Sequence, residues 1–161
     1  MKNILIVKLS AIGDVIHALP VSYAIKETFP DSHVTWVAEA AACELLLANP
    51  CVDELILFKK QEFKSLRGFA QNFLPFRRML KKRRYETSLD LQGLFKSAAI
   101  VAAAGAKRKL GTCHMRELSH KISRPVRGAH ASGHIVEQYL DVARAMGCRV
   151  EKVVLDRKSV V

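Results

Sequence analysis

Short apolar runs alternate with longer segments of mixed polarity along most of the chain. The apolar runs have the length and composition of buried β-strands, and we predict strands at residues 3–7, 33–38, 54–58, 87–91 and 108–111. Apolar positions three and four residues apart predict helices at residues 13–29, 40–48, 64–84, 94–104 and 133–146. Gly105 and Gly147 come directly after two of these segments, where a helix commonly ends.

The segment 64–84 is expected as two helical pieces, because a proline inside a helix removes a backbone hydrogen bond. Pro75 would then open the second piece. Phe69 and Phe73 share one face of the first piece, and bases cover the other side. Such a helix can lie on an anionic membrane surface, or its aromatic face can pack on the protein's own sheet.

Alternating strands and helices predict an α/β fold, a Rossmann-like parallel sheet with helices on both faces. With 161 residues the chain is expected to be one domain, residues 1–161. Ligands of such sheets bind beyond the carboxyl ends of the strands. That rule directs attention to the turn 10–14, to Glu39, and to the turns 90–96 and 112–116.

Positive charge is concentrated in two zones. The net charge is +11, yet residues 59–84 hold ten Lys or Arg against one acid, and residues 107–127 hold seven against one. The rest of the chain is therefore net acidic. Concentrated positive charge attracts anions such as phosphorylated lipid, nucleic acid or acidic sugar, although a solvated basic face would look the same.

The four cysteines are far apart and form no C-x-x-C pair, so neither a structural zinc site nor a redox motif is indicated. Free thiols fit a reducing cytoplasm. No apolar run approaches the ~18 residues of a membrane-spanning helix. Lys8 interrupts the first apolar run and no small-residue cleavage site follows, so we expect no secretory signal.

Several familiar site motifs are absent. The turn after the first strand has one glycine, Gly13, where a dinucleotide fingerprint needs three, and Asp14 stands where the phosphate would lie. Glu39 imitates the ribose-binding acid of that motif. There is no P-loop and no nucleophile elbow. His130 and His134 are four residues apart, but no acid or cysteine is near enough in sequence to complete a metal site, so no metal is expected.

Asp14 opens the first predicted helix. A carboxylate there complements the helix dipole and can accept hydrogen bonds from free backbone N–H groups. The same carboxylate lies at the ligand end of the predicted sheet, where it could act as a general base toward a sugar hydroxyl. Residue chemistry alone leaves both interpretations open.

Two longer motifs carry a family resemblance. VKLSAIGDVIHALP (7–20) and DLQGLFKSA (90–98) resemble the lipopolysaccharide heptosyltransferases of glycosyltransferase family nine, most closely the heptosyltransferase I branch. HIVEQYL (134–140) is similar to a further, less specific segment of that family. The resemblance runs through nearly the whole chain.

The resemblance implies the N-terminal, acceptor-side half of a GT-B fold. It implies inverting, metal-independent transfer of heptose from ADP-L-glycero-D-manno-heptose to the Kdo-lipid A inner core, without a cofactor. The partners would be the acceptor, the nucleotide-sugar donor held by the other half, and the anionic inner-membrane surface, on whose cytoplasmic face the enzyme would be peripheral. No nucleic acid is implied.

The resemblance also assigns residues. Asp14 matches the family's proposed catalytic base. The residues matched to acceptor binding or to the shape of that turn are Ser10, Gly13, Lys59, Lys60, Lys64, Arg67, Lys96 and Arg116. Kdo carboxylates and lipid A phosphates are anions that Arg and Lys bind.

A C-terminal donor-binding domain of ~150 residues is expected to be absent from this chain. The chain alone is therefore expected not to turn over ADP-heptose, and the ending DRKSVV (156–161) would mark a fragment or a truncated reading frame.

Two other functions stay open: a Rossmann-like nucleotide-binding domain of another enzyme that uses Glu39, or a non-enzymatic basic module for anionic membrane or nucleic acid. Against nucleic acid, Tyr85 is the one ring expected to be exposed beside the basic run 77–84, so stacking surfaces are scarce.

Overall fold

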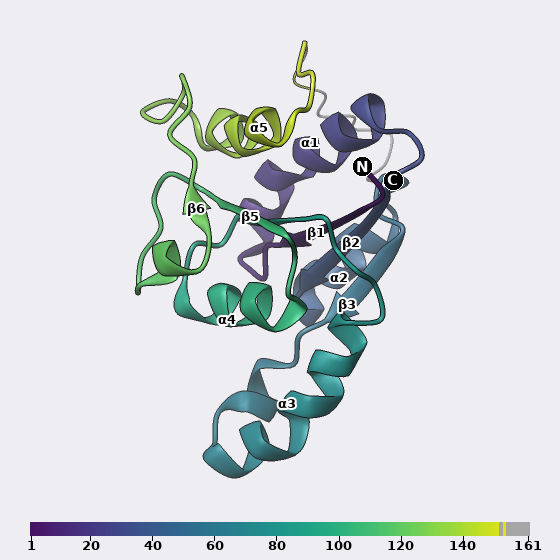
Figure 1. The fold of residues 1–161 in the computed structure, drawn as a ribbon, viewed down its shortest axis with the longest axis vertical. Coiled ribbons are helices and arrows are strands. Elements are labelled where there is room, and N and C mark those ends of the chain that lie inside the picture. Colours follow the sequence, from purple (N-terminus) through teal and green to yellow (C-terminus); the bar gives the residue numbers. More distant parts are fainter. Residues whose placement is uncertain (152, 154–161) are drawn as a thin grey trace.

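A six-stranded, fully parallel sheet forms the centre of the molecule in a computed structural model, which describes residues 1–151 and 153. The DRKSVV segment lies outside the described residues. The order across the sheet is β3-β2-β1-β4-β5-β6 (Figure 1). The strands are β1 Asn3–Val7, β2 His33–Ala38, β3 Glu54–Leu57, β4 Thr87–Asp90, β5 Arg108–Gly111 and β6 Arg124–Pro125. The predicted parallel sheet is confirmed, and the two-residue β6 is an addition to it.

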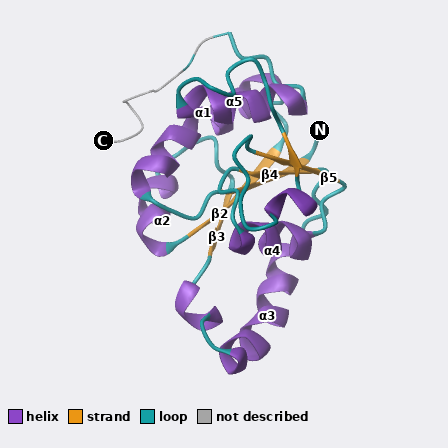
Figure 2. Cartoon of the chain, turned by 90° about the vertical axis from the view of Figure 1, so that its left-hand side faces the viewer, coloured by secondary structure: helices purple, strands orange, loops and turns teal. Residues whose placement is uncertain are grey.

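Helices cover both faces of the sheet, as predicted (Figure 2). Side chains alternate along β1, so Ile4 and Ile6 join the core under α1, α2 and α5, while Leu5 and Val7 join the core under α3 and α4. The helices are α1 Ile12–Thr28, α2 Ala40–Leu47, α3 Leu66–Leu80, α4 Phe95–Ala104 and α5 Ile135–Met146. Two short 3₁₀ turns, η1 Lys60–Phe63 and η2 Ser119–Lys121, lie in the connections.

The predicted ends of α4 and α5 are confirmed. Gly105 and Gly147 both have positive φ, at 68° and 116°, and each donates its backbone N–H to a carbonyl of the preceding helix.

The predicted break at Pro75 is wrong, because α3 runs through it as one helix. Pro75 is exposed on the outer side of α3, and the helix is held by other contacts. Ser65 caps its first turn by accepting from the Gly68 N–H at 3.0 Å, while Phe76 and Leu80 are buried against the sheet. Figure 1 shows α3 projecting away from the sheet, joined to it by this last part.

The expected exposed ring of Tyr85 is also wrong. Tyr85 is buried in the core under α3 and α4, so the basic run before it has no stacking surface of its own.

Among the residues that the structure describes, no helix is both long enough and apolar enough to cross a membrane.

Candidate active site

The strand order reverses between β1 and β4, since β1 continues to β2 on one side and β4 to β5 on the other. In open α/β sheets a crevice forms at the carboxyl ends of the strands at such a point. The turn 8–14 leaves β1 there, and the turn 90–96 leaves β4. The two motifs that carried the family resemblance therefore meet at the place where this fold binds ligands.

Asp14 is the third residue of α1, because the helix begins at Ile12 with Ala11 as its N-cap. The carboxylate is 52% exposed, and its Oδ2 lies 3.8 Å from Nζ of Lys8. Asp14 therefore complements the helix dipole without being the cap, and an incoming polar group can reach it.

Lys8 is the main residue that sequence reasoning missed. Its side chain is only 4% exposed, and its Nζ lies 5.5 Å from the centre of the Tyr139 ring in α5. Burial lowers the pKa of Lys8, while the charges of Asp14 and Asp90 act in the opposite direction. Burial, with a smaller contribution from Asp14, raises the pKa of Tyr139 to about 12. The signal available in the sequence was a single lysine inside an apolar strand run.

The motif DLQGLFKSA (90–98) holds the turn after β1 in place through hydrogen bonds. Oε1 of Gln92 accepts from the backbone N–H groups of Leu9 at 3.1 Å and Ser10 at 3.3 Å. Oδ1 of Asp90 accepts from the N–H groups of Gly93 at 2.8 Å and Gln92 at 3.2 Å. The predicted turn residue Ser10 is thus placed by a side chain 82 residues further along the chain.

The Asp90 carboxyl group is fully buried. Burial raises its pKa, opposed by the backbone hydrogen bond from Gly93 and by the charge of Lys8. Its second oxygen, Oδ2, has no hydrogen-bond partner. The site therefore contains two buried ionisable groups, Lys8 and Asp90, beneath one accessible carboxylate.

Arg116 reaches the same edge of the sheet through its backbone. Its N–H donates to the carbonyl of Gly93 at 2.8 Å, and the Ser119 hydroxyl donates to the same carbonyl at 3.0 Å. Gly93 has a φ of +68°, which favours glycine at this tight junction. The Arg116 side chain is exposed, so the predicted acceptor-binding arginine lies beside the β4 turn and faces solvent.

Lys96 and Glu39 join the carboxyl ends of β2 and β4. Nζ of Lys96, in the first turn of α4, lies 3.7 Å from Oε1 of Glu39, the N-cap residue of α2. The Glu39 N–H also donates to the carbonyl of Leu9 at 3.0 Å. The acid that imitates a ribose-binding residue is therefore paired with a predicted acceptor-binding lysine.

The basic segment 59–67 divides between two directions. Lys60 and Lys64 line the same pocket as Lys96, whereas Lys59 pairs with Glu62 at 3.5 Å and lines a neighbouring hollow. Arg67 is exposed in the first turn of α3. Gly13 is exposed in α1, and a Cβ atom built on it would meet nothing within 4 Å. Of the four bases predicted in this segment, Lys60 and Lys64 therefore line the pocket that also contains Lys96, and Lys59 and Arg67 do not.

His130 contacts an acid that lies eleven residues further along the chain. Nδ1 of His130 lies 2.9 Å from Oδ1 of Asp141, and Arg144 contacts the same oxygen at 2.8 Å. These contacts lower the pKa of Asp141, although burial acts against them. Within residues 1–151 and 153, no three His, Cys, Asp or Glu side chains are grouped so that they could hold a metal ion.

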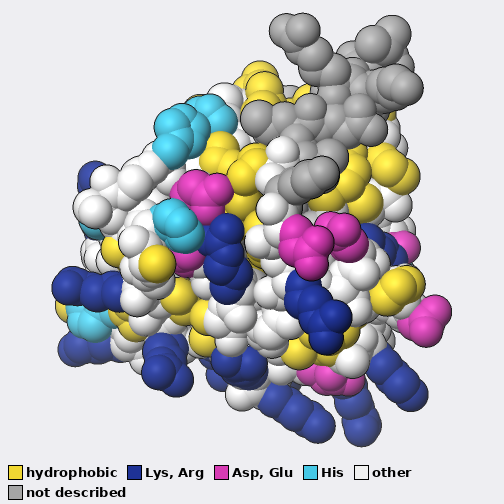
Figure 3. All heavy atoms as spheres, turned by 90° about the horizontal axis from the view of Figure 1, so that it is seen from above, with side chains coloured by type: hydrophobic (Ala, Val, Ile, Leu, Met, Phe, Trp, Pro, Cys, Tyr) yellow, Lys and Arg dark blue, Asp and Glu magenta, His cyan; other side chains and the backbone are white. Residues whose placement is uncertain are grey.

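The four cysteines are free, as expected, but only Cys148 is buried; the other three are partly exposed. Figure 3, which looks onto the end of the molecule that carries α1 and α5, shows acidic side chains within this face and Lys and Arg side chains gathered along one rim.

Residues 73–157 match the family model described as glycosyltransferase family 9 (heptosyltransferase), which covers more than half of the chain. The chain belongs to glycosyltransferase family 9. Among the curated members of this family, lipopolysaccharide core heptosyltransferase OpsX of Haemophilus influenzae is 27% identical over 149 residues, which are 91% of this chain and 41% of the relative. Lipopolysaccharide heptosyltransferase 1 of Pseudomonas aeruginosa is 32% identical over 64% of this chain and 30% of its own length.

Solved structures of the family share the sheet and its helices. E. coli heptosyltransferase WaaC with ADP superposes with a TM-score of 0.77 at 27% identity, over 91% of this chain and 48% of that one. The chain thus spans less than half the length of these family 9 relatives. The predicted family and fold class are confirmed.

Proposed function

We propose that this chain supplies the acceptor-binding half of a lipopolysaccharide heptosyltransferase, the N-terminal half of a GT-B fold. The whole enzyme would transfer heptose from ADP-L-glycero-D-manno-heptose to the Kdo-lipid A inner core. The observation that carries the proposal is the accessible Asp14 carboxylate beside the buried Lys8, at the same edge of the sheet as Lys96 and Arg116. A base for the attacking hydroxyl and cations for an anionic acceptor lie at one edge of the sheet.

In the proposed reaction Asp14 takes the proton of an acceptor hydroxyl as its oxygen bonds to the anomeric carbon of heptose. The bond from that carbon to the ADP oxygen breaks at the same time, and the electron pair leaves with ADP. Attack from the face opposite ADP inverts the anomeric centre. Lys8 acts as a positioning residue, because its ammonium group holds the carboxylate from below at 3.8 Å.

The cations would hold the acceptor rather than the donor. Lys60, Lys64 and Lys96 share one pocket rim, and Arg116 follows β5 at the same edge. Charge-assisted hydrogen bonds from such groups suit carboxylates and phosphates. The donor would be bound by a further half, and the transfer would need neither a metal nor a cofactor. The enzyme would be peripheral on the cytoplasmic face of the inner membrane.

Asp14→Asn tests the role of the carboxylate in a full-length protein that includes a donor-binding half. Asparagine keeps the size of the side chain and removes its basicity. The turnover number should fall about 10²- to 10⁴-fold, which is the usual contribution of a general base. The melting temperature should change little, because the side chain is half exposed. Turnover at the wild-type rate would leave Asp14 as a helix-dipole residue alone.

One observation favours a second function. The strand order β3-β2-β1-β4-β5-β6 is that of dinucleotide-binding domains. Against it, Glu39 is engaged by Lys96 and the glycine fingerprint is absent. A calorimetric titration with NAD distinguishes the two functions: saturable binding that is lost in Glu39→Ala would favour the dinucleotide enzyme over the heptosyltransferase.

A further inference from the structure

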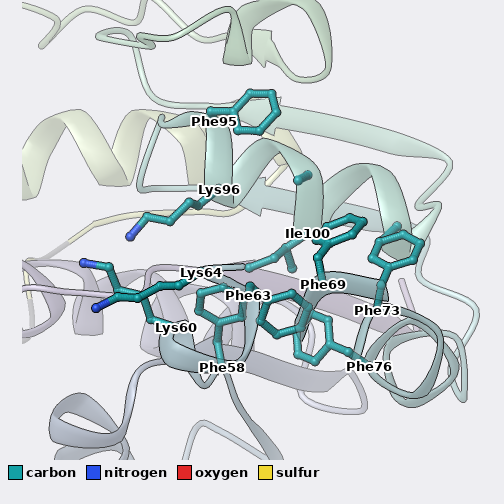
Figure 4. A pocket seen from close by; sticks show the side chains of 12 residues that line it. Phe58, Lys60, Phe63, Lys64, Phe69, Phe73, Phe76, Phe95, Lys96 and Ile100 are labelled. Atoms are coloured by element: carbon teal, nitrogen blue, oxygen red, sulfur yellow. The ribbon is translucent and has the colours of Figure 1, made fainter. Parts of the chain in front are cut away.

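Six of the seven phenylalanines in the chain line one pocket of about 330 Å³ (Figure 4). One wall comes from the end of β3, from η1 and from α3, and the opposite wall is α4, with Ala99, Ile100 and Ala103. The rings are those of Phe58, Phe63, Phe69, Phe73, Phe76 and Phe95.

The rings pack on one another from the core outward. Phe63 stacks on the buried Phe58 at 5.2 Å between ring centres, and Phe69 stacks on Phe73 at 5.0 Å. At the opening, Phe69 is 47% exposed and Phe95 is 65% exposed. An apolar hollow of this kind that stays open to solvent marks a binding site.

Three ammonium groups stand at one end of this pocket. Figure 4 shows the side chains of Lys60, Lys64 and Lys96 ending close together, with the rings other than Phe95 toward the other end. Lys96 contacts Glu39 at 3.7 Å. Over the described part of the chain, no carboxylate pairs with Lys60 or Lys64. The pocket therefore combines an apolar interior with three cations, of which Lys60 and Lys64 have no carboxylate partner among the described residues and Lys96 is paired with Glu39.

We infer that this pocket binds one alkyl chain of an anionic amphiphile, with the anionic headgroup on the three lysines. The rings exclude water from an alkyl chain, and only an anionic headgroup compensates the cations at the mouth. An uncharged apolar partner, such as a packed helix face, would leave those cations unpaired.

The position of the three lysines at the end of the pocket sets the orientation of the bound amphiphile. Lys96 pairs with Glu39, which follows β2, so the rim lies at the edge of the sheet that also carries Asp14. An amphiphile seated this way has its alkyl chain between α3 and α4, and its polar end on the side of the candidate active site. The statement that this ligand is the lipid part of the acceptor rests on the proposed function. The inference that the pocket binds an alkyl chain and an anionic headgroup does not depend on it.

Alkyl phosphates of two chain lengths test the inference by calorimetry, below their micelle-forming concentrations. Decyl phosphate should bind about fifteenfold more tightly than octyl phosphate, because each buried methylene contributes ~0.8 kcal/mol. Inorganic phosphate and decyl maltoside should each bind at least tenfold more weakly than decyl phosphate. Inorganic phosphate lacks the alkyl chain, and decyl maltoside lacks the anionic headgroup. Equal affinity for octyl and decyl phosphate, or for decyl phosphate and decyl maltoside, would overturn the inference.

Two exposed alanines of α4 offer a matched pair of variants. Ala99 lines the pocket and Ala102 does not. Ala99→Trp should fill the pocket and abolish binding of decyl phosphate, whereas Ala102→Trp should bind it like the wild type. Equal losses in the two variants would contradict a bound chain at this place.

Substitutions of the lysines at the end of the pocket test the headgroup contacts and leave the apolar wall unchanged. Lys60→Gln and Lys64→Gln should each weaken decyl phosphate binding about tenfold, the usual effect of losing one charged hydrogen bond. Lys107→Gln, at the amino end of β5, is the matched control and should bind normally. Failure of these binding tests would remove the alkyl site and leave heptose transfer to a deacylated acceptor untouched, so the two proposals fail separately.

Discussion

Single residues at the carboxyl ends of β1 and β4 combine accessible and buried charge. Asp14 is accessible, whereas Lys8 and Asp90 are buried beneath it. Burying a charge is unfavourable unless another charge or several hydrogen bonds compensate it. Lys8 and Asp90 compensate each other in part, because the charge of each opposes the effect of burial on the pKa of the other.

Asp90→Asn should remove a pH dependence of stability. Burial raises the pKa of Asp90 above its ordinary value of 3.8, so the native state keeps a proton that the unfolded chain loses. The free energy of unfolding of the wild type should therefore fall, relative to the variant, as pH rises from 3.8 to the native pKa. Each tenfold difference in proton affinity corresponds to about 1.4 kcal/mol.

Urea unfolding at a series of pH values measures this difference. Asp31→Asn, at an exposed carboxyl group between α1 and β2, is the control and should follow the wild type. A difference between wild type and Asp90→Asn that stays constant with pH would contradict the prediction.

At the scale of elements, α3 is set apart from the other helices. Phe76 and Leu80 near its end are buried against the sheet, while Leu66 in its first turn is 92% exposed. η1 packs against it, and the two together form one wall of the phenylalanine pocket. The first turn of α3 therefore lies next to the segment that carries Lys60 and Lys64.

Ser65→Ala should loosen that first turn. The Ser65 hydroxyl accepts from the Gly68 N–H, and loss of such a cap costs ~1 kcal/mol. Amide hydrogen exchange in the first turns of α3 should report the loss, with exchange about fivefold faster. Ser65→Asp keeps an accepting oxygen and should restore protection. Unchanged exchange in Ser65→Ala would mean that tertiary packing alone holds this end.

Binding of α3 to membranes is predicted to depend on both its charges and its exposed apolar side chains. The chain should bind anionic vesicles, and binding should weaken with salt as the Debye length shortens. Leu66→Gln and Leu74→Gln should weaken it further, because both side chains are more than half exposed on α3. Leu47→Gln, exposed at the end of α2, is the control. Equal binding to neutral vesicles would remove the electrostatic part of the prediction.

On the scale of the whole molecule, the basic residues lie at opposite edges of the sheet. Lys64, Lys96 and Arg116 follow strands at the carboxyl edge, whereas Arg83 and Arg84 lead into β4 from the amino edge. Arg83 is engaged there, with Nε 2.6 Å from Oε2 of Glu54, and this contact lowers the pKa of Glu54. Charge density along the sequence therefore does not tell which basic residues lie at the carboxyl edge of the sheet.

Arg116→Ala and Lys64→Ala should each weaken binding of a Kdo-bearing lipid A analogue without acyl chains by about ten- to a hundredfold. Both side chains are exposed at the carboxyl edge of the sheet. Arg84→Ala is the control, because Arg84 is exposed at the amino edge and, unlike Arg83, forms no ion pair with Glu54. Calorimetry measures the affinities. Losses of the same size at all three positions would indicate diffuse attraction in place of a defined site.

The sequence by itself determined most of the elements, the fold class and the edge of the sheet where the candidate site is proposed. Apolar periodicity and glycine at helix ends are local properties, so strands such as Arg108–Gly111 and helix ends such as Gly105 were predicted correctly. Because the carboxyl ends of parallel strands meet at one edge, the turns after β1 and β4 could be expected to lie together.

Only the tertiary structure decided how side chains distant in sequence pair within that frame. Gln92 holds the backbone of Ser10, Lys8 lies under Asp14, and Asp141 joins His130. The core also overrode local expectation twice, by burying Tyr85 and by keeping α3 helical through a proline. The physical reason is the same in each case: burial and long-range hydrogen bonds depend on which elements pack together, and local propensity is too weak to oppose them.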